Sequence, residues 1–439
     1  MDNDYIDKMG KESKAKWRFQ DEIQMVSNKI IEVVLGYRIG SVSVDGILKW
    51  KKRRCGVVRF SFDEKYLGLE QMKLANVLKT TRLPIGIIVT MDKKFVTVED
   101  NNGYSPFCEV DYDGIAEKIS DYFEDVPLVL DNESVKIELR KRFEKSPSFQ
   151  RKEDIKPIYE QAIEHLDYSI QGEVTIGSKE EDALFLSLLG EIEGETICRY
   201  TTMDNLFKLI EKKSQNMCSI ASMNDPNEGS YADSKMSWIA DVERRIPVIN
   251  QENGVYLLSC SQIENLDNLT MWRLYGDDAK GVCFEYDVLK DRIDKENFFI
   301  APVSYGQQNG SHPELEFINH LQSKPLEKGW YFKFCNWFRW KYFFKSYNYA
   351  IEKEVRLLYF HVDNKNRVWY QDSANGIFNQ MVCFPITMND CQFPLELSRI
   401  ILGPKTSFPK KNQEQIRQML DDSSIICLDI DISNIDNYR

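Results

Sequence analysis

The spacing of apolar residues changes along the chain and separates segments of different character. Apolar positions at helical spacing predict helices over residues 12–35 and 68–79, because residues three and four apart share a helix face. Runs rich in β-branched residues predict strands over 55–62 and 84–90, and a turn at 91–93 precedes a further strand that ends near residue 98. With the extended stretch 37–49, the first hundred residues predict an α-β-β-α-β-β order.

The pattern changes twice after this region. Residues 115–190 are charge-rich and helical in character, whereas short β-branched strands alternate with helices and loops from Ile197 onward. We therefore expect an α+β protein in three parts. These are an α/β domain over 1–120, a helical linker over 121–190 and a second domain over 191–439.

Length and charge narrow the classes of protein. A chain of 439 residues is too long for one compact core, and 42% apolar residues suffice to bury more than one. The net charge is −12, yet residues 1–120 carry 20 Lys and Arg against 18 Asp and Glu. A chain with this negative charge is not expected to be a protein that coats nucleic acid without sequence preference. If a polynucleotide is bound, the N-terminal part is the better candidate.

Targeting and metal signals are missing from the sequence. The first 16 residues are polar, and no apolar run approaches the ~20 residues of a membrane span. The ten cysteines form no Cys-x-x-Cys pair, and the four histidines show no metal-ligand spacing. These features predict a cytoplasmic protein without a membrane partner or a metal site.

A basic turn spans Lys49 to Arg54 and contains five cations in six residues. The simplest interpretation is a solvated hairpin tip. The functional alternative is a tip that contacts phosphates or docks on a partner, with binding that weakens as salt rises.

The N-terminal order resembles type I restriction subunits and other restriction-endonuclease-like proteins. In that family a hairpin strand ends in Glu-x-Lys, which holds a metal together with an upstream acid. Here Asp45 is the candidate upstream acid, but Arg59 and Ser61 stand where the catalytic pair is needed. We therefore expect either an inactive nuclease relic or an unrelated α/β domain. Its role would be sensing or targeting, through a partner protein or nucleic acid.

The most informative residues form a dispersed set in the C-terminal half. Arg199, the Ser259-Cys260-Ser261 segment and the Glu352-Lys353-Glu354 segment each lie in a strand-like run. Side chains two apart on a strand share a face, so the two serines pair, and so do the two glutamates. The sequence predicts that these five polar side chains converge on one cleft.

Several further boxes accompany this set in order: Met223-Asn224-Asp225-Pro226-Asn227-Glu228, Met271-Trp272-Arg273-Leu274-Tyr275, Lys280-Gly281-Val282 and Glu352-Lys353-Glu354-Val355-Arg356. Over residues 196–439 they resemble the bacterial family known as domain of unknown function 2971. That family is grouped with the mono-ADP-ribosyltransferases, whose signature is Arg…Ser-x-Ser…Glu-x-Glu. The resemblance implies a C-terminal ADP-ribosyltransferase-like domain with a split β-sheet around an NAD cleft.

The resemblance also implies roles for single residues. Cleavage of the nicotinamide–ribose bond passes through an oxocarbenium-like state, which a fixed carboxylate stabilises. Glu354 is assigned that role, and Glu352 orients or deprotonates the acceptor. The other candidates would bind the cofactor or support the cleft. Arg199 binds NAD, and Ser259 and Ser261 support the cleft. Tyr200 or Tyr275 stacks on nicotinamide, and Asn224 is a further cofactor-binding candidate.

The expected function is an NAD-dependent mono-ADP-ribosyltransferase-like effector, such as a toxin of bacterial antiviral defence, that modifies a macromolecular acceptor without a metal. Two alternatives remain open. One is an NAD glycohydrolase, and the other is a non-catalytic module that binds nucleotide or nucleic acid. Each residue also has a structural interpretation: Glu354 with Arg356 as a surface charge pair, and the aromatic segment 330–349 as a buried amphipathic helix.

Overall fold

The structure is a computed structural model. It describes residues 10–39, 42–100, 103–124, 126, 131–147, 155–169, 172–192, 194–220, 230–237, 254–293, 298–360, 367–372 and 377–436. The chain forms two compact units. The first contains Met1–Leu184, Asp233–Ile246 and Glu314–Asn336, and the second contains Phe185–Ala232, Pro247–Pro313 and Trp337–Arg439. Both helices and mixed sheets are present, so the predicted α+β class is confirmed.

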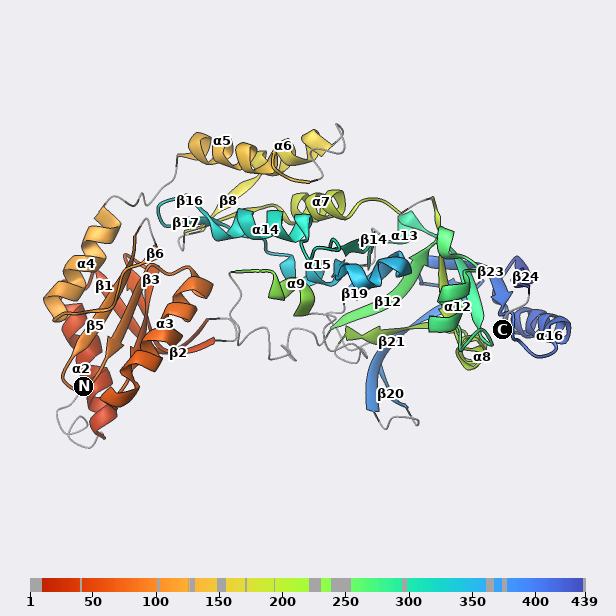
Figure 1. The fold of residues 1–439 in the computed structure, drawn as a ribbon, viewed down its shortest axis with the longest axis horizontal. Coiled ribbons are helices and arrows are strands. Elements are labelled where there is room, and N and C mark those ends of the chain that lie inside the picture. The colour runs from red at the N-terminus through yellow and green to blue at the C-terminus, as the bar shows by residue number, and fades with distance from the viewer. Residues whose placement is uncertain are drawn as a thin grey trace. The chain divides into compact units, whose positions relative to one another are not determined.

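The first unit begins with a sheet whose strands follow chain order (Figure 1). They are β1 (Ile31–Ile39), β2 (Val42–Trp50), β3 (Arg53–Phe60), β4 (Ile85–Val89), β5 (Lys94–Asp100), β6 (Gly103–Tyr104) and β7 (Cys108–Glu109), which pairs with β5. Strands β3 and β4 run parallel, and the other neighbours are antiparallel. A parallel step needs a crossover, which α3 (Leu67–Thr81) supplies.

Helices cover both faces of this sheet (Figure 1). Helices α2 (Lys11–Val26) and α4 (Tyr112–Glu124) pack on one face, and α3 packs on the other. In β4, Ile85 and Ile87 belong to the core under α2 and α4, whereas Ile88 joins Leu74 and Leu78 of α3. A strand buried on both faces is apolar at every position, which explains the uninterrupted run at 84–90.

The predicted helix over residues 12–35 is too long. Helix α2 ends at Val26, and Asn28 and Lys29 follow with φ of 51° and 63°. The Ser27 hydroxyl donates to Ile23 O at 2.6 Å, which satisfies a carbonyl in the last turn. The β-branched residues after this stop form β1, so the observed order is α-β-β-β-α-β-β.

The region expected to be a helical linker is part of the first unit. It contains α5 (Asn132–Phe143), α6 (Lys156–Glu164), β8 (Leu166–Tyr168), β9 (Glu173–Ile176) and the start of α7 (Ser178–Leu189). A later segment, α14 (Pro313–Ser323), β16 (Pro325–Glu327) and β17 (Trp330–Phe332), completes the sheet β16-β17-β9-β8. Arg142 of α5 ties the two segments together, because it donates to Lys324 O at 2.9 Å and to Pro325 O at 2.6 Å.

The second unit is organised around an eleven-stranded sheet that forks at β12 (Val255–Gln262). At one end of β12, Ser261 and Gln262 pair with β10 (Thr196–Thr201), and at the other end Tyr256 and Leu257 pair with β11 (Ser214–Ser219). One branch continues as β10-β13-β23-β24, and the other as β11-β21-β20. These strands are β13 (Val282–Val288), β20 (Arg367–Asp372), β21 (Ile377–Thr387), β23 (Leu395–Leu402) and β24 (Asp429–Ile432), and β22 (Asp390–Cys391) pairs with β21.

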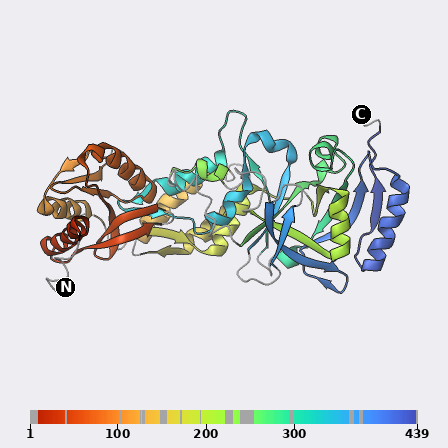
Figure 2. The same cartoon turned by 90° about the horizontal axis from the view of Figure 1, so that it is seen from below.

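The opposite edge of β12 pairs along its length with β19 (Glu354–Phe360), and β19 also pairs with β14 (Phe298–Pro302). Helix α8 (Met203–Lys212) connects β10 to β11, and α16 (Pro409–Ser423) lies along β23 and β24 at the blue end of the chain (Figure 2). The shorter elements are α9 (Ser230–Ser234), α12 (Leu269–Tyr275), α13 (Lys290–Ile293), β15 (Ser304–Tyr305), α15 (Trp337–Trp340), β18 (Phe344–Lys345) and the 3₁₀ helix η6 (Tyr347–Glu352). The split sheet that the resemblance implied is thus a single sheet with two branches.

The aromatic segment 330–349 does not form the single amphipathic helix expected from its sequence. It contains β17, α15 and β18 and leads into η6. Trp340, Phe343 and Phe344 are fully buried, so the aromatic content reflects core packing.

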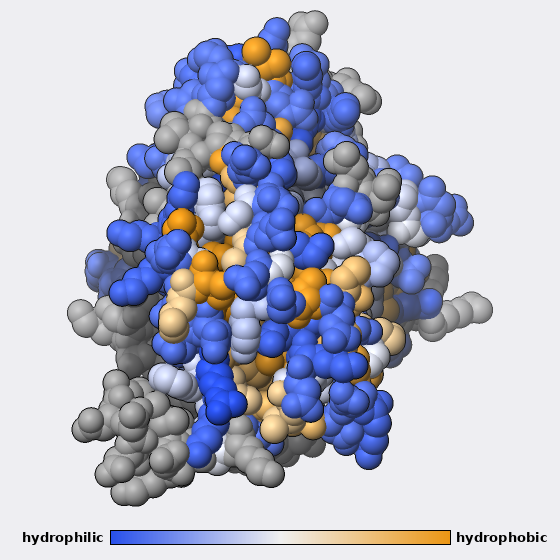
Figure 3. Space-filling view, turned by 90° about the vertical axis from the view of Figure 1, so that its left-hand side faces the viewer, coloured by the Kyte–Doolittle hydropathy of each residue, from blue (hydrophilic) through white to orange (hydrophobic). Residues whose placement is uncertain are grey.

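The surface of the first unit mixes polar and apolar residues. Figure 3 shows hydrophobic residues emerging between hydrophilic ones on the face it draws.

Among the residues that the structure describes, no helix combines the length and apolar character needed to cross a membrane.

The close approach of β3 and β4 gives a test of this packing. A Cβ added at Gly56 would lie 2.7 Å from the backbone oxygen of Ile85, so we expect Gly56→Ala to lower the free energy of unfolding by about 1–3 kcal/mol. Gly68→Ala in α3 is the control, because nothing lies within 4 Å of the added Cβ. Urea unfolding of both variants checks the prediction, and equal midpoints would contradict it.

Candidate functional site

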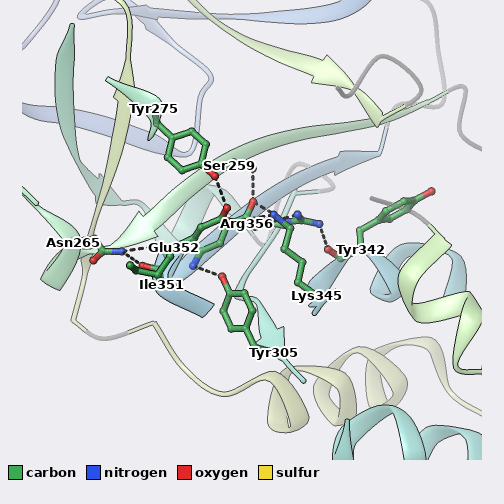
Figure 4. A network of polar contacts seen from close by, with 10 residues as sticks. Ser259, Asn265, Tyr275, Tyr305, Tyr342, Lys345, Ile351, Glu352 and Arg356 are labelled. Atoms are coloured by element: carbon green, nitrogen blue, oxygen red, sulfur yellow. Dashed lines mark hydrogen bonds and ion pairs between the residues drawn. The ribbon is translucent and has the colours of Figure 1, made fainter. Parts of the chain in front are cut away.

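A buried carboxylate, that of Glu354, is the centre of the candidate site, and Figure 4 labels its partners Ser259, Lys345 and Arg356. Glu354, the first residue of β19, is only 3% exposed. Arg356 donates to both of its oxygens, from Nε to Oε1 at 2.9 Å and from Nη2 to Oε2 at 3.1 Å. Lys345 Nζ lies 2.7 Å from Oε2, and the Ser259 hydroxyl donates to Oε1. Glu354 therefore has two cationic partners and a hydroxyl donor.

The pairing of β12 with β19 brings these side chains together. Ser261 lies opposite Glu354, and Ser259 lies opposite Arg356. Directly opposed residues of an antiparallel pair project to the same face, so the four side chains share one face of the sheet. Ser259 and Ser261 therefore lie on the same face as Glu354, and the Ser259 hydroxyl contacts it across 95 residues of sequence.

Glu352 reaches the same cluster from a different element. It is the last residue of η6, and Lys353 follows with φ of 42°, so the two glutamates do not lie on one strand as expected. Lys345 Nζ nevertheless lies 3.1 Å from Glu352 Oε2, and the Tyr275 hydroxyl donates to Oε1. Lys345 bridges the two carboxylates.

Neighbouring groups fix the backbone around this cluster (Figure 4). Asn265 Nδ2 donates to Ile351 O at 3.0 Å and to Glu352 O at 2.8 Å. The Tyr305 hydroxyl accepts from the Glu354 N–H at 2.8 Å, and Arg356 Nη1 donates to Tyr342 O. The end of η6 and the start of β19 are therefore held by side chains from β15 and from the loop after β12.

The charges in the cluster balance, with two glutamates against Lys345 and Arg356. Burial raises the pKa of Glu354, and the neighbouring Lys345 opposes that rise. Burial alone would lower the pKa of Lys345, but the charges of Glu354 and Glu352 outweigh it and raise the pKa. Burial and the bond to Glu352 raise the pKa of Tyr275, so its phenol stays protonated and donates.

The structure does not bring Arg199 to this cluster. Its neighbour Cys198 lies opposite Ser261, so Arg199 projects to the other face of the sheet. There it lines a cavity of about 530 Å³ in the fork between β10 and β11, together with Lys208, Lys212 and Cys218. Arg199 and Glu354 therefore project to different faces of the sheet, and the expected convergence of all five polar residues is not observed.

The remaining candidates lie in different settings. Tyr200 is buried; its hydroxyl donates to Asn265 O at 2.6 Å and accepts from the Asn268 N–H at 2.7 Å. Its ring packs edge-on against Trp272, so it supports the core and offers no free face for stacking. Tyr275 is 44% exposed beside the cluster. Asn224 lies outside the described residues.

Two contributors were not among the predicted site residues. Arg356 stands two positions after Glu354, and strand alternation already suggested the two as a surface charge pair. They do pair, but both are buried. Lys345 lies in the aromatic segment assigned to an amphipathic helix, and the spacing of that segment gives no signal that Lys345 would meet both glutamates. Only the tertiary fold reveals it.

Asp45, the candidate upstream acid of the N-terminal domain, makes contacts within the sheet and with α2. Asp45 Oδ2 accepts from the Phe60 N–H at 3.0 Å, and Lys16 Nζ lies 3.2 Å from Asp45 Oδ1. Arg59 Nε lies 3.2 Å from Glu70 of α3. Both residues therefore have a role in holding the sheet and its helices.

Residues 271–357 match the model of a family described as protein of unknown function (DUF2971). The predicted family resemblance is confirmed there, over a shorter stretch than the expected 196–439. The matched residues include Tyr275, Lys345, Glu352, Glu354 and Arg356. No curated protein matches the chain.

Two solved structures show weak similarity. The type IIG restriction endonuclease BpuSI is 12% identical with a TM-score of 0.18, covering 31% of this chain and 19% of that one. A DrdV–DNA complex is 16% identical with a TM-score of 0.22, covering 41% of this chain and 17% of that one. The chain thus spans less than a fifth of either relative, and similarity of this extent identifies neither fold nor function.

The buried ion pairs predict a large effect on stability. Arg356→Met should lower the free energy of unfolding by about 3–5 kcal/mol, because it leaves a buried carboxylate with one cation. Adding Glu354→Gln should restore part of the loss, since the uncompensated charge is then removed.

Lys353→Met is the matched control. Lys353 is 51% exposed and lies 3.7 Å from Glu264, so its loss should cost at most about 1 kcal/mol. Urea unfolding of the four proteins measures these differences. A stability of Arg356→Met equal to that of Lys353→Met would show that the network contributes little.

Proposed function

We propose that the C-terminal unit cleaves the nicotinamide–ribose bond of NAD and transfers ADP-ribose to a macromolecular acceptor. The observation that supports this most is the hydrogen bond from Ser259 to Glu354, with Glu352 joined to the same cluster through Lys345. A positioned carboxylate braced by a hydroxyl, with a second carboxylate close by, is what this reaction needs.

The two carboxylates, Glu354 and Glu352, would have different roles in the reaction. The bond between ribose C1′ and the nicotinamide nitrogen breaks, and its electron pair leaves with nicotinamide. Glu354 stabilises the positive charge that develops on the ribose. The acceptor then bonds to C1′, and its proton passes to Glu352. With water as the acceptor, the same steps give hydrolysis.

Access to Glu354 requires a rearrangement, because Lys345 and Arg356 occupy its oxygens. Lys345 is the cation that can move, since Arg356 is fully buried and also bonded to Tyr342. Tyr275 and Tyr349 are half-exposed beside the cluster, and Lys345 Nζ lies 5.1 Å from the centre of the Tyr349 ring. The diphosphate of NAD would attract Lys345 away from Glu354. Lys345 would then bind NAD, which is the role first expected of Arg199.

A second candidate is a non-catalytic module that binds nucleotide or nucleic acid. The observation that favours it is the complete pairing of Glu354 in a position 3% exposed. In that case the cluster only stabilises the fold.

Labelled NAD, incubated with the purified chain and cell extract, separates these functions. Transfer puts label on a macromolecule, hydrolysis releases free ADP-ribose, and a non-catalytic module does neither. We expect Glu354→Gln to lower both activities about 10²-fold or more, because it removes the charge that stabilises the transition state. Glu352→Gln should reduce transfer far more than hydrolysis.

Glu264→Gln serves as the control, because this glutamate is partly exposed and pairs with Lys353 at 3.7 Å. Circular dichroism and unfolding midpoints separate loss of chemistry from loss of fold. Full activity of a folded Glu354→Gln variant would exclude the proposed mechanism.

A further inference from the structure

A recessed cationic pocket lies within the first unit, apart from the glutamate cluster. Its volume is about 220 Å³, and its walls come from the start of β3, the end of α3 and the segment around β17. The charged residues that line it are Arg53, Arg54, Arg82, Glu173 and Lys333. Four cations against one carboxylate give it a positive character, in a chain whose net charge is −12.

Arg53 is the key residue of this pocket. The sequence places it in a turn that should be solvated, yet it is only 4% exposed. Its Nη2 donates to Gly329 O, and its guanidinium lies 4.8 Å from the centre of the Trp330 ring. Its Nη1 is buried without a hydrogen-bond acceptor among the described residues. A buried guanidinium with an unused donor is costly unless an anion accepts from it.

Gln322, which also lines the pocket, repeats this feature. It is 1% exposed, and its Oε1 accepts from the Phe334 N–H at 2.9 Å. Its Nε2 is buried and has no acceptor in the part of the chain that the structure describes. Within the described residues, two buried donors in one pocket therefore lack acceptors.

Arg82 adds a second guanidinium, which is partly buried. It follows α3 with φ of 55°, and its Nη1 donates to Phe332 O at 3.2 Å. Its guanidinium lies 5.4 Å from the centre of the Tyr331 ring, and burial lowers its pKa to about 10. The one carboxylate in the lining is already engaged, because Glu173 Oε1 lies 2.9 Å from Lys333 Nζ.

We propose that this pocket binds the phosphate group of a small phosphorylated ligand. A phosphate offers several acceptor oxygens and a negative charge, which suit the free donors of Arg53 and Gln322 and the charge of Arg82. The pocket is smaller than the about 300 Å³ or more typical of sites that enclose a whole drug-sized ligand. It would therefore take the phosphate end, with the rest of the molecule toward the opening. This proposal does not depend on the NAD reaction.

Isothermal titration calorimetry of the full chain with inorganic phosphate and with adenosine monophosphate tests the proposal. We expect at least one of them to bind, with affinity that falls as salt rises. Equal affinities would mean that the phosphate alone is recognised, and tighter binding of the nucleotide would mean that its organic part contributes. If neither binds, the proposal is wrong. It is equally wrong if only a 5′-phosphorylated oligonucleotide binds.

Two variants tie the binding to this pocket. Arg53→Lys keeps the charge but removes the planar fork, and it should weaken binding at least tenfold. Gln322→Glu keeps the acceptor for Phe334 and replaces the unused donor with a carboxylate oxygen. We expect it to abolish phosphate binding and to raise the unfolding temperature, since it neutralises part of the buried positive charge.

Arg140→Met is the control, because Arg140 lies elsewhere in the unit and pairs with Glu160 at 3.0 Å. It should bind phosphate like the original chain. Unchanged binding by folded Gln322→Glu or Arg53→Lys would overturn the assignment of the pocket.

Discussion

The contact on which the second unit depends is the pairing of the buried Glu354 carboxylate with Arg356 and Lys345. A carboxylate removed from water is tolerated only if cations and hydrogen-bond donors replace its hydration. Here the donors come from three elements, because Arg356 lies on β19, Lys345 on β18 and Ser259 on β12. The requirement to satisfy one carboxylate thus fixes where these elements meet, and it fixes the position of Glu352 through Lys345.

The same contacts that stabilise this arrangement limit its chemistry. With Lys345 and Arg356 in place, neither oxygen of Glu354 is open to a substrate. A catalytic role is compatible with the fold only if one cation leaves. Lys345 is the less buried of the two, and its ammonium is a point charge on a flexible stem, whereas Arg356 carries a planar fork. Lys345 therefore stabilises the cluster when it is bound to Glu354, and the proposed catalysis requires it to move away.

Local sequence patterns predicted the parts of the fold that depend on local rules. The β-branched run at 84–90 and the serine pair of β12 follow directly from residue preference and strand alternation. The long helix over 12–35 failed because its stop rests on left-handed residues at Asn28 and Lys29, which apolar spacing does not report. Glu352 was misplaced for the same kind of reason, since Lys353 interrupts the strand.

The error for Arg199 has a different origin. Alternation gives the relative orientation of residues within one strand, but the face shared by two strands depends on their register, which only the folded sheet defines. Cys198 lies opposite Ser261, and a shift of one residue would have put Arg199 beside the serines instead. The same limit applies to Lys345, whose position depends on non-local packing of the aromatic segment.

Two buried arginines show why burial alone does not reveal a role. Arg356 meets a carboxylate on its own strand, so its charge is compensated inside the protein. Arg53 contacts a backbone carbonyl and the face of an aromatic ring. The carbonyl dipole and the ring quadrupole attract a cation, but neither group carries a negative charge. The first arginine completes a closed network, whereas the second leaves a positive charge and a donor directed into a pocket. That difference is the physical reason to look for a ligand at Arg53 and for a structural constraint at Arg356.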